Sequence, residues 1–212
     1  MSLHDPHQGQ PVPRRGPEPS AARLAAILLH GRGASAEDIL ELAAEFRLDD
    51  VAYVAPQAAG STWYPFSFLK PMPENEPGLS SALEVIDGLV NGLGRQGIEP
   101  ERIAILGFSQ GACLTLEFAA RRPRRYAAIV GLSGGLIGPP GTPRNYPGLL
   151  DGAPVFLGCS DVDAHIPVER VHESAEVFRR MGAAVDERIY PRMGHLVNAD
   201  EIAAVRRLLA GK

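Results

Sequence analysis

Residues 102–121 read RIAILGFSQGACLTLEFAAR. The apolar run Arg102–Leu106 predicts a strand that is buried on both faces, and Gln110–Arg121 predicts a helix that ends before Pro123. The junction at Gly107–Gly111 matches G-x-S-x-G, a motif typical of a sharp strand-to-helix turn that exposes a nucleophilic serine. Glycines flank Ser109 because side chains would collide in so tight a turn. The stretch therefore predicts a parallel sheet with a serine nucleophile at its edge.

Strands and helices alternate on both sides of this turn. Further strands are predicted at Leu24–Leu29, Val51–Ala55, Ala127–Leu132, Val155–Gly158 and Val185–Tyr190. Helices are predicted at 35–46, from a capping box of Ser81 and Glu84 through Leu93, at Val168–Met181 and at Glu201–Leu209. Six strands that alternate with helices indicate the α/β class, with a mostly parallel, doubly wound sheet and helices on both faces. In such sheets functional side chains gather at the carboxyl ends of the strands.

The length and composition fit one domain. The chain has 212 residues, of which 45% are hydrophobic and 22% charged, close to the globular average. We expect residues 1–22 to form an extended, proline-rich arm with a short edge strand near Val12, because proline excludes a helix or a central strand. A single domain is then expected at 23–212.

Charge and targeting signals narrow the function classes. The net charge is −4, so the chain has no basic excess, and we expect no nucleic-acid partner and no stable membrane insertion. Residues 1–20 lack the apolar run of an export signal, and we expect a cytoplasmic protein. Cys113 and Cys159 lack the spacing of metal ligands and are interpreted as core residues. The oligomeric state is left open, with a homodimer as one option.

A serine nucleophile needs partners, because its hydroxyl is weakly reactive at neutral pH. A base must take its proton, and a carboxylate must orient the base. In this kind of sheet the partners follow in the order Ser, acid, His. His195 is the candidate base because it follows the last strand and precedes the last helix. The other histidines fit less well: His4 and His7 lie in the arm, His30 precedes the nucleophile, His165 follows the candidate acid too closely, and His172 lies inside a helix.

Two aspartates, Asp161 and Asp163, follow the strand at Val155–Gly158 and both qualify as the acid. Asp163 is favoured because it lies deeper in the loop, and Asp161 is then expected to form a turn by bonding its own backbone. The tetrahedral intermediate of acyl transfer also needs two N–H donors. We expect these to be the backbone N–H groups of Gln110, after the nucleophile, and of Arg32, in the loop after the first strand.

Two long connections, at 56–79 and 133–153, are expected to shape the substrate pocket. Their apolar side chains suit an acyl or aryl group, and the candidate substrate-binding residues are Gly31, Trp63, Phe66 and Leu136. The second connection is too short for a helical cap, so we expect an open, shallow site. The side chain of Arg32 is expected to be solvated, and His30 is expected to pack beneath its loop.

The chain resembles the phospholipase/carboxylesterase family of the α/β-hydrolase superfamily, which includes the acyl-protein thioesterases. The resemblance is carried by Leu28–Ser35 (LLHGRGAS), Ala55–Gln57 (APQ), Gly107–Gly111 (GFSQG) and Asp163–Pro167 (DAHIP). It implies an α/β-hydrolase fold without a large cap and a serine hydrolase without a cofactor or metal. It also implies Ser109 as nucleophile, Asp163 as acid, His195 as base, and Arg32 and Gln110 as oxyanion donors.

The leading hypothesis is a serine carboxylesterase that cleaves esters of small to medium acyl or aryl groups through an acyl-enzyme. The same three residues would equally serve a thioesterase or a lysophospholipase, or act on amides and in acyl transfer. A hypothesis of a different class is a non-catalytic binding protein with this fold. The expected partner is a small-molecule ester.

Overall fold

A seven-stranded sheet forms the centre of the computed structural model, which describes residues 5–211. Its strands stand in the order β1-β3-β2-β4-β5-β6-β7. All neighbouring strands are parallel except β1 and β3, which are antiparallel. The strands are β1 (Arg14–Arg15), β2 (Leu24–Leu29), β3 (Val51–Val54), β4 (Ile103–Phe108), β5 (Ala128–Leu132), β6 (Pro154–Ser160) and β7 (Ala184–Tyr190). The predicted α/β class and mostly parallel sheet are confirmed.

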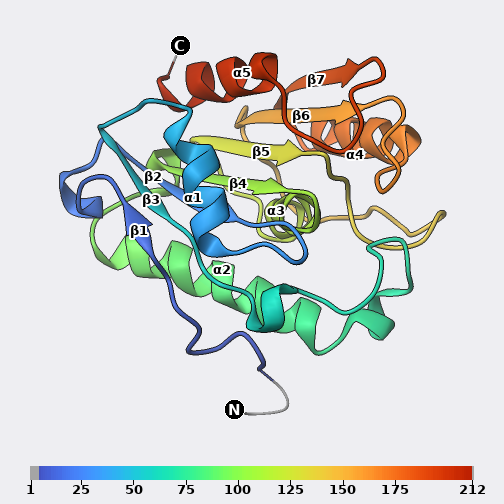
Figure 1. Ribbon diagram of the computed structural model, residues 1–212, viewed down its shortest axis with the longest axis horizontal. Helices are drawn as coiled ribbons and strands as arrows, with labels where there is room; N and C mark the ends of the chain where they lie inside the picture. The colour runs from blue at the N-terminus through green and yellow to red at the C-terminus, as the bar shows by residue number, and fades with distance from the viewer. Residues whose placement is uncertain (1–4, 212) are drawn as a thin grey trace.

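Five α-helices of the described chain cover both faces of this sheet (Figure 1). One face packs on α1 (Ala36–Ala44) and α5 (Ala199–Leu209), and the other on α2 (Gly78–Arg95), α3 (Gln110–Arg121) and α4 (Val168–Arg180). Because both faces are covered, β2 and β5 are buried along their whole length, which explains their continuous apolar sequences. The result is a hydrophobic core on each side of the sheet.

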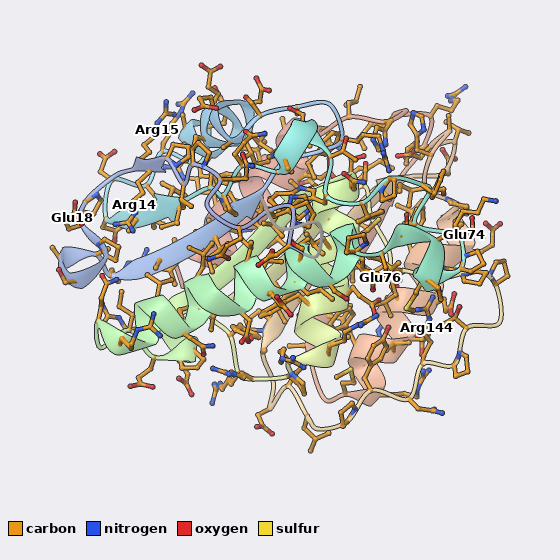
Figure 2. The ribbon with its side chains drawn as sticks, turned by 90° about the horizontal axis from the view of Figure 1, so that it is seen from below. Arg14, Arg15, Glu18, Glu74, Glu76 and Arg144 are labelled. Carbon is orange, nitrogen blue, oxygen red and sulfur yellow. The ribbon has the colours of Figure 1, made fainter. Side chains whose placement is uncertain are left out.

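The arrowheads of β5 and β6 point to the side of the molecule where the long loops lie (Figure 1). Seen from below, Arg14, Arg15 and Glu18 lie at one end of the molecule, whereas Glu74, Glu76 and Arg144 lie at the other (Figure 2). The two long connections meet there, since the N–H of Gly138 donates to the carbonyl of Phe68 at 2.7 Å. Within residues 5–211 neither connection forms a cap over the sheet, as expected.

The edge strand of the arm lies at Arg14–Arg15, two residues beyond the predicted place near Val12, and it makes seven strands instead of six. Proline explains the shift. Residues 11 and 13 have no N–H and contribute only carbonyls, which accept from the N–H groups of Gln57 and Ala55. Residues 1–4 of the predicted arm lie outside the described residues, and the division at residue 22 stays a prediction.

The predicted start of α2 is wrong. The helix begins at Gly78, and Ser81 lies inside its first turn, buried at 1% exposure. The hydroxyl of Ser81 donates to the carboxylate of Asp5 and accepts from the N–H of His7. The serine therefore binds the arm instead of capping the helix, a contact that no local pattern at 81–84 could reveal.

Candidate active site

Ser109 stands at the turn between β4 and α3 with φ 55° and ψ −118°, a strained conformation for a residue with a side chain. The neighbouring glycines make this turn sterically feasible. A Cβ atom on Gly107 would lie 2.2 Å from the carbonyl oxygen of Gly111, and one on Gly111 would lie 2.1 Å from that of Leu29. The strand and the helix therefore pack too closely for any side chain at these two positions.

Three side chains from distant parts of the sequence form one chain of hydrogen bonds. Nε2 of His195 lies 2.8 Å from Oγ of Ser109, and Nδ1 of His195 lies 2.7 Å from Oδ2 of Asp163. Ser109 follows β4, Asp163 follows β6, and His195 follows β7. The carboxyl ends of three parallel strands thus bring together the three residues that the sequence selected, at the distances that a nucleophile, a base and an orienting acid require.

Asp163 is held in its charged form. Its side chain is completely buried, and burial raises the pKa of the carboxyl. Hydrogen bonds from His195 and from the N–H groups of His165 (2.8 Å) and Ile166 (3.1 Å) outweigh burial, so the net pKa lies below the ordinary value. A carboxylate at this place can keep the proton of His195 on Nδ1 and leave Nε2 free to accept from Ser109.

Asp161 has a different role from the one expected. Its Oδ1 accepts the N–H of Arg192 at 2.7 Å, so it ties the loop after β6 to the loop that carries His195. The expectation that Asp161 bonds its own backbone is therefore replaced by a contact between two loops.

The predicted oxyanion donors lie beside the nucleophile. Gln110 is the first residue of α3, and its N–H belongs to the unpaired groups at the helix N-terminus. The loop of Arg32 packs on the strand-to-helix turn that carries Ser109. A Cβ atom on Gly31 would lie 3.4 Å from Cβ of Ser109. Among the backbone hydrogen bonds of residues 5–211 that lie outside helices and strands, none is donated by the N–H of Arg32 or of Gln110.

His30 supports this loop from within the core, as expected. It is fully buried, its Nδ1 bonds the carbonyl of Gly31 at 2.8 Å, and its Nε2 accepts the N–H of Ala58 at 3.1 Å. Burial lowers the pKa of His30, and its hydrogen bond to Gly31 offsets this only in part. A neutral ring with the proton on Nδ1 satisfies both contacts.

A cavity of about 500 Å³ opens beside Ser109. Two of the predicted substrate-binding residues, Gly31 and Phe66, lie in its wall. Its apolar lining also includes Tyr64, Phe68, Phe108, Cys113 and Ile166. Tyr64 and Phe68 belong to the 56–79 connection, whose apolar side chains were expected to shape the pocket. Sequence reasoning did not select Phe108, Cys113 or Ile166, although Phe108 stands inside the G-x-S-x-G motif. His165, rejected as a base, also lines the cavity, and its ring centroid lies 4.8 Å from that of His195.

Comparisons with known proteins establish the family of the chain. The family model described as Phospholipase/Carboxylesterase matches residues 17–211. The chain belongs to this family. A phospholipase/carboxylesterase from Dyadobacter fermentans, solved by crystallography, is 41% identical with a TM-score of 0.92, over 96% of this chain and 97% of that one. The α/β-hydrolase fold that the resemblance implied is thereby confirmed.

Curated relatives in the phospholipase/carboxylesterase family are more distant. The acyl-protein thioesterase 1 of Saccharomyces cerevisiae is 30% identical over 59% of this chain and 56% of its own length. That of Gibberella zeae is 28% identical over 64% of this chain and 59% of its own length. The aligned part therefore spans less than two thirds of each of these relatives.

The other two predicted substrate-binding residues of this family member lie away from the cavity. Trp63 and Leu136 are fully buried and do not line the cavity. The indole N–H of Trp63 donates to the carbonyl of His30 at 2.9 Å, which turns the ring into the core beneath the loop of Arg32. Leu136 is held away by its main chain, whose N–H donates to Oγ of Ser174 and whose carbonyl accepts from Arg170.

The side chain of Arg32 also differs from the expectation of a solvated group. Although the residue is exposed, its guanidinium donates to three main-chain carbonyls of the neighbouring loop. None of the helices within residues 5–211 combines the length and the hydrophobicity that a membrane-spanning helix needs.

Proposed function

We propose that this member of the phospholipase/carboxylesterase family is a serine carboxylesterase that acts on esters of small to medium acyl or aryl groups. The single observation that carries the proposal is the hydrogen-bonded chain from Ser109 through His195 to Asp163. Hydroxyl, imidazole and buried carboxylate stand in the order in which proton transfer must run for a serine to attack a carbonyl.

The reaction then has two halves. His195 takes the proton of Ser109 while Oγ attacks the ester carbonyl, and the N–H groups of Arg32 and Gln110 stabilise the oxyanion. His195 returns the proton to the leaving alcohol, which gives an acyl-enzyme. Water, activated by the same nitrogen, attacks the acyl-enzyme and releases the acid and the serine.

The cavity supports small to medium ester substrates. Its volume of about 500 Å³ lies in the lower part of the range of small-molecule sites, and the aromatic rings of Phe66, Phe68 and Phe108 suit an acyl or aryl group. A second candidate, hydrolysis of thioesters, is favoured by the named relatives of Saccharomyces cerevisiae and Gibberella zeae. Lysophospholipid hydrolysis would use the same machinery. In each of these reactions Ser109, His195 and Asp163 would have the same roles.

The test combines labelling with turnover. The purified chain is treated with a fluorophosphonate probe, and hydrolysis of p-nitrophenyl butyrate is measured for wild type, Ser109→Ala and Ser80→Ala. Ser80 is an exposed serine that bonds Glu76 and serves as the control. We expect Ser109→Ala to lose labelling and at least about 10³-fold in rate, and Ser80→Ala to match wild type. A wild-type chain that neither labels nor turns over would favour the non-catalytic binding protein.

A further inference from the structure

Arg32 presents its side chain to a single stretch of main chain. The guanidinium donates to the carbonyl oxygens of Tyr64 (3.0 Å), Pro65 (2.9 Å) and Phe66 (2.6 Å). Three consecutive carbonyls that converge on one cation must curve around it, so this side chain fixes the path of residues 64–66. The same three residues form part of the cavity wall beside Ser109.

Other side chains hold this wall as well, because it has no regular secondary structure to pair its polar groups. The side chain of Gln110 accepts from the N–H of Trp63 at 2.9 Å and donates to the carbonyl of Tyr64 at 2.8 Å. The fully buried Asn75 accepts from the N–H of Phe66 at 2.9 Å. Gln110 and Arg32, whose N–H groups are the proposed oxyanion donors, thus both bond the wall through their side chains.

The guanidinium of Arg32 is therefore largely occupied. It has five N–H donors, and three of them bond the wall. Its carbon centre also lies 6.0 Å from the ring centroid of Tyr64, which adds a cation–π contact with a residue of the wall. Most of the donors of this side chain are thus directed at protein groups, which is the bonding of a residue that positions a loop.

We infer that Arg32 is a positioning residue that sets the acyl-chain preference of the proposed esterase. This inference rests on the proposed function. The side chain of Arg32 keeps residues 64–66 at one distance from Ser109, and its main chain supplies an oxyanion donor. An acyl group that fits the cavity leaves residues 64–66 and the N–H of Arg32 in place. A larger group pushes the wall outward, and because Arg32 is bonded to the wall, its N–H is displaced from the oxyanion. Oversized substrates therefore lose kcat in addition to binding.

The test uses Arg32→Met and Arg32→Lys in the full chain. Both keep the main-chain N–H, so the proposed oxyanion donor remains, and lysine retains a cation that can reach at least one carbonyl. Arg102→Met is the matched control, since Arg102 also donates to two main-chain carbonyls, those of Ala22 and Arg23, at the opposite ends of the strands. kcat and KM are measured for p-nitrophenyl acetate, butyrate and octanoate.

We expect Arg32→Met to narrow the ratio of kcat/KM between the best and the worst of these esters by at least about tenfold, mainly through kcat for octanoate. Arg32→Lys should give an intermediate ratio, and Arg102→Met the wild-type ratio. An Arg32→Met enzyme that keeps the wild-type ratio overturns the inference, as does a wild type without chain-length preference. A p-nitrophenyl monoester of a dicarboxylic acid is measured beside these three esters. If Arg32→Met loses activity on this anionic ester alone, Arg32 binds an anionic group of the substrate, which also overturns the inference.

Hydrogen exchange separates failure of the inference from failure of the proposed function. Arg32→Met should speed exchange of the amides within 63–67 by at least about tenfold, while Arg102→Met leaves them unchanged. Wild-type exchange together with a wild-type ester ratio overturns the inference and leaves the esterase proposal intact if Ser109 still takes the fluorophosphonate. Absence of labelling and turnover in wild type overturns both.

Discussion

Replacing Asp163 by asparagine removes one charge from the site with almost no change in shape. Oδ1 of Asp163 accepts two main-chain N–H groups, at 2.8 and 3.1 Å, and Oδ2 faces Nδ1 of His195 at 2.7 Å. If the asparagine oxygen takes the position of Oδ1 and accepts the two main-chain N–H groups, its NH2 group faces His195. There it can bond only an acceptor nitrogen. The imidazole proton then moves to Nε2, and the ring can no longer accept the proton of Ser109.

The expected loss in kcat is about 10⁴-fold, the size that a wrong imidazole tautomer causes in a serine triad. It corresponds to about 5.4 kcal/mol in the activation free energy, at about 1.36 kcal/mol for each tenfold change. The assay is kcat at saturating p-nitrophenyl butyrate, with the urea midpoint of unfolding as a check that the variant is folded. Burial of Asp163 with all of its oxygens bonded makes this check necessary.

Asp161→Asn is the matched control, because it makes the same change two residues away. Asp161 accepts only the N–H of Arg192 and makes no hydrogen bond to His195 among the described residues. We expect its kcat to stay within about tenfold of wild type. A loss below about 100-fold in folded Asp163→Asn, or a larger loss in Asp161→Asn, would refute the tautomer argument and reopen the choice of acid.

Three further predictions concern stability and the pocket. Burial raises the pKa of Glu201 to about 7, so the folded state holds its proton more tightly and stability falls as pH rises from about 4.5 to 7. Glu201→Gln should therefore add up to about 3 kcal/mol to the free energy of unfolding at pH 8 but not at pH 4. Urea unfolding measures this difference, and an equal shift of the midpoint at both pH values would contradict the prediction. Gly111→Ala should destabilise by more than about 3 kcal/mol because its Cβ would meet the Leu29 carbonyl, whereas Gly88→Ala, a helical site with open space, should gain about 0.5–1 kcal/mol in thermal unfolding. Trp63→Phe should cost about 1–3 kcal/mol through the lost indole bond yet keep the wild-type order of ester preference, and a changed order would place Trp63 at the substrate after all.

The parts of the fold that sequence could predict are those in which one local pattern has one structural solution. β2 and β4 are continuous apolar runs, and a parallel sheet between helix layers is where such runs are buried. Ser109 and His195 were selectable because the chemistry demands these residue types at strand ends, and the structure brings them within 2.8 Å. Their catalytic roles are proposals: Ser109→Ala tests the nucleophile, and Asp163→Asn tests the base through the tautomer of His195.

The loops could not be predicted in the same way, because their side-chain directions depend on partners far away in the sequence. Trp63 turns inward because of the carbonyl of His30, and Leu136 because of Ser174 and Arg170. Ser81 matches a capping pattern with Glu84, but contacts with the arm decide its environment. No periodicity in 56–79 or 133–153 encodes these contacts, so the aromatic residues of 56–79 offered no means of choosing which ones face the cavity.

The antiparallel β1 has a consequence for the chain in crowded solution. Without it, β3 would present an unpaired edge onto which a strand of another molecule could add. β1 covers that edge with only two residues, Arg14 and Arg15, both charged and exposed. Prolines at 11, 13 and 17 flank this pair and keep the strand short, because proline cannot donate to a regular ladder. On this side the sheet therefore ends in a short, charged strand, a form of edge that disfavours the addition of a further strand.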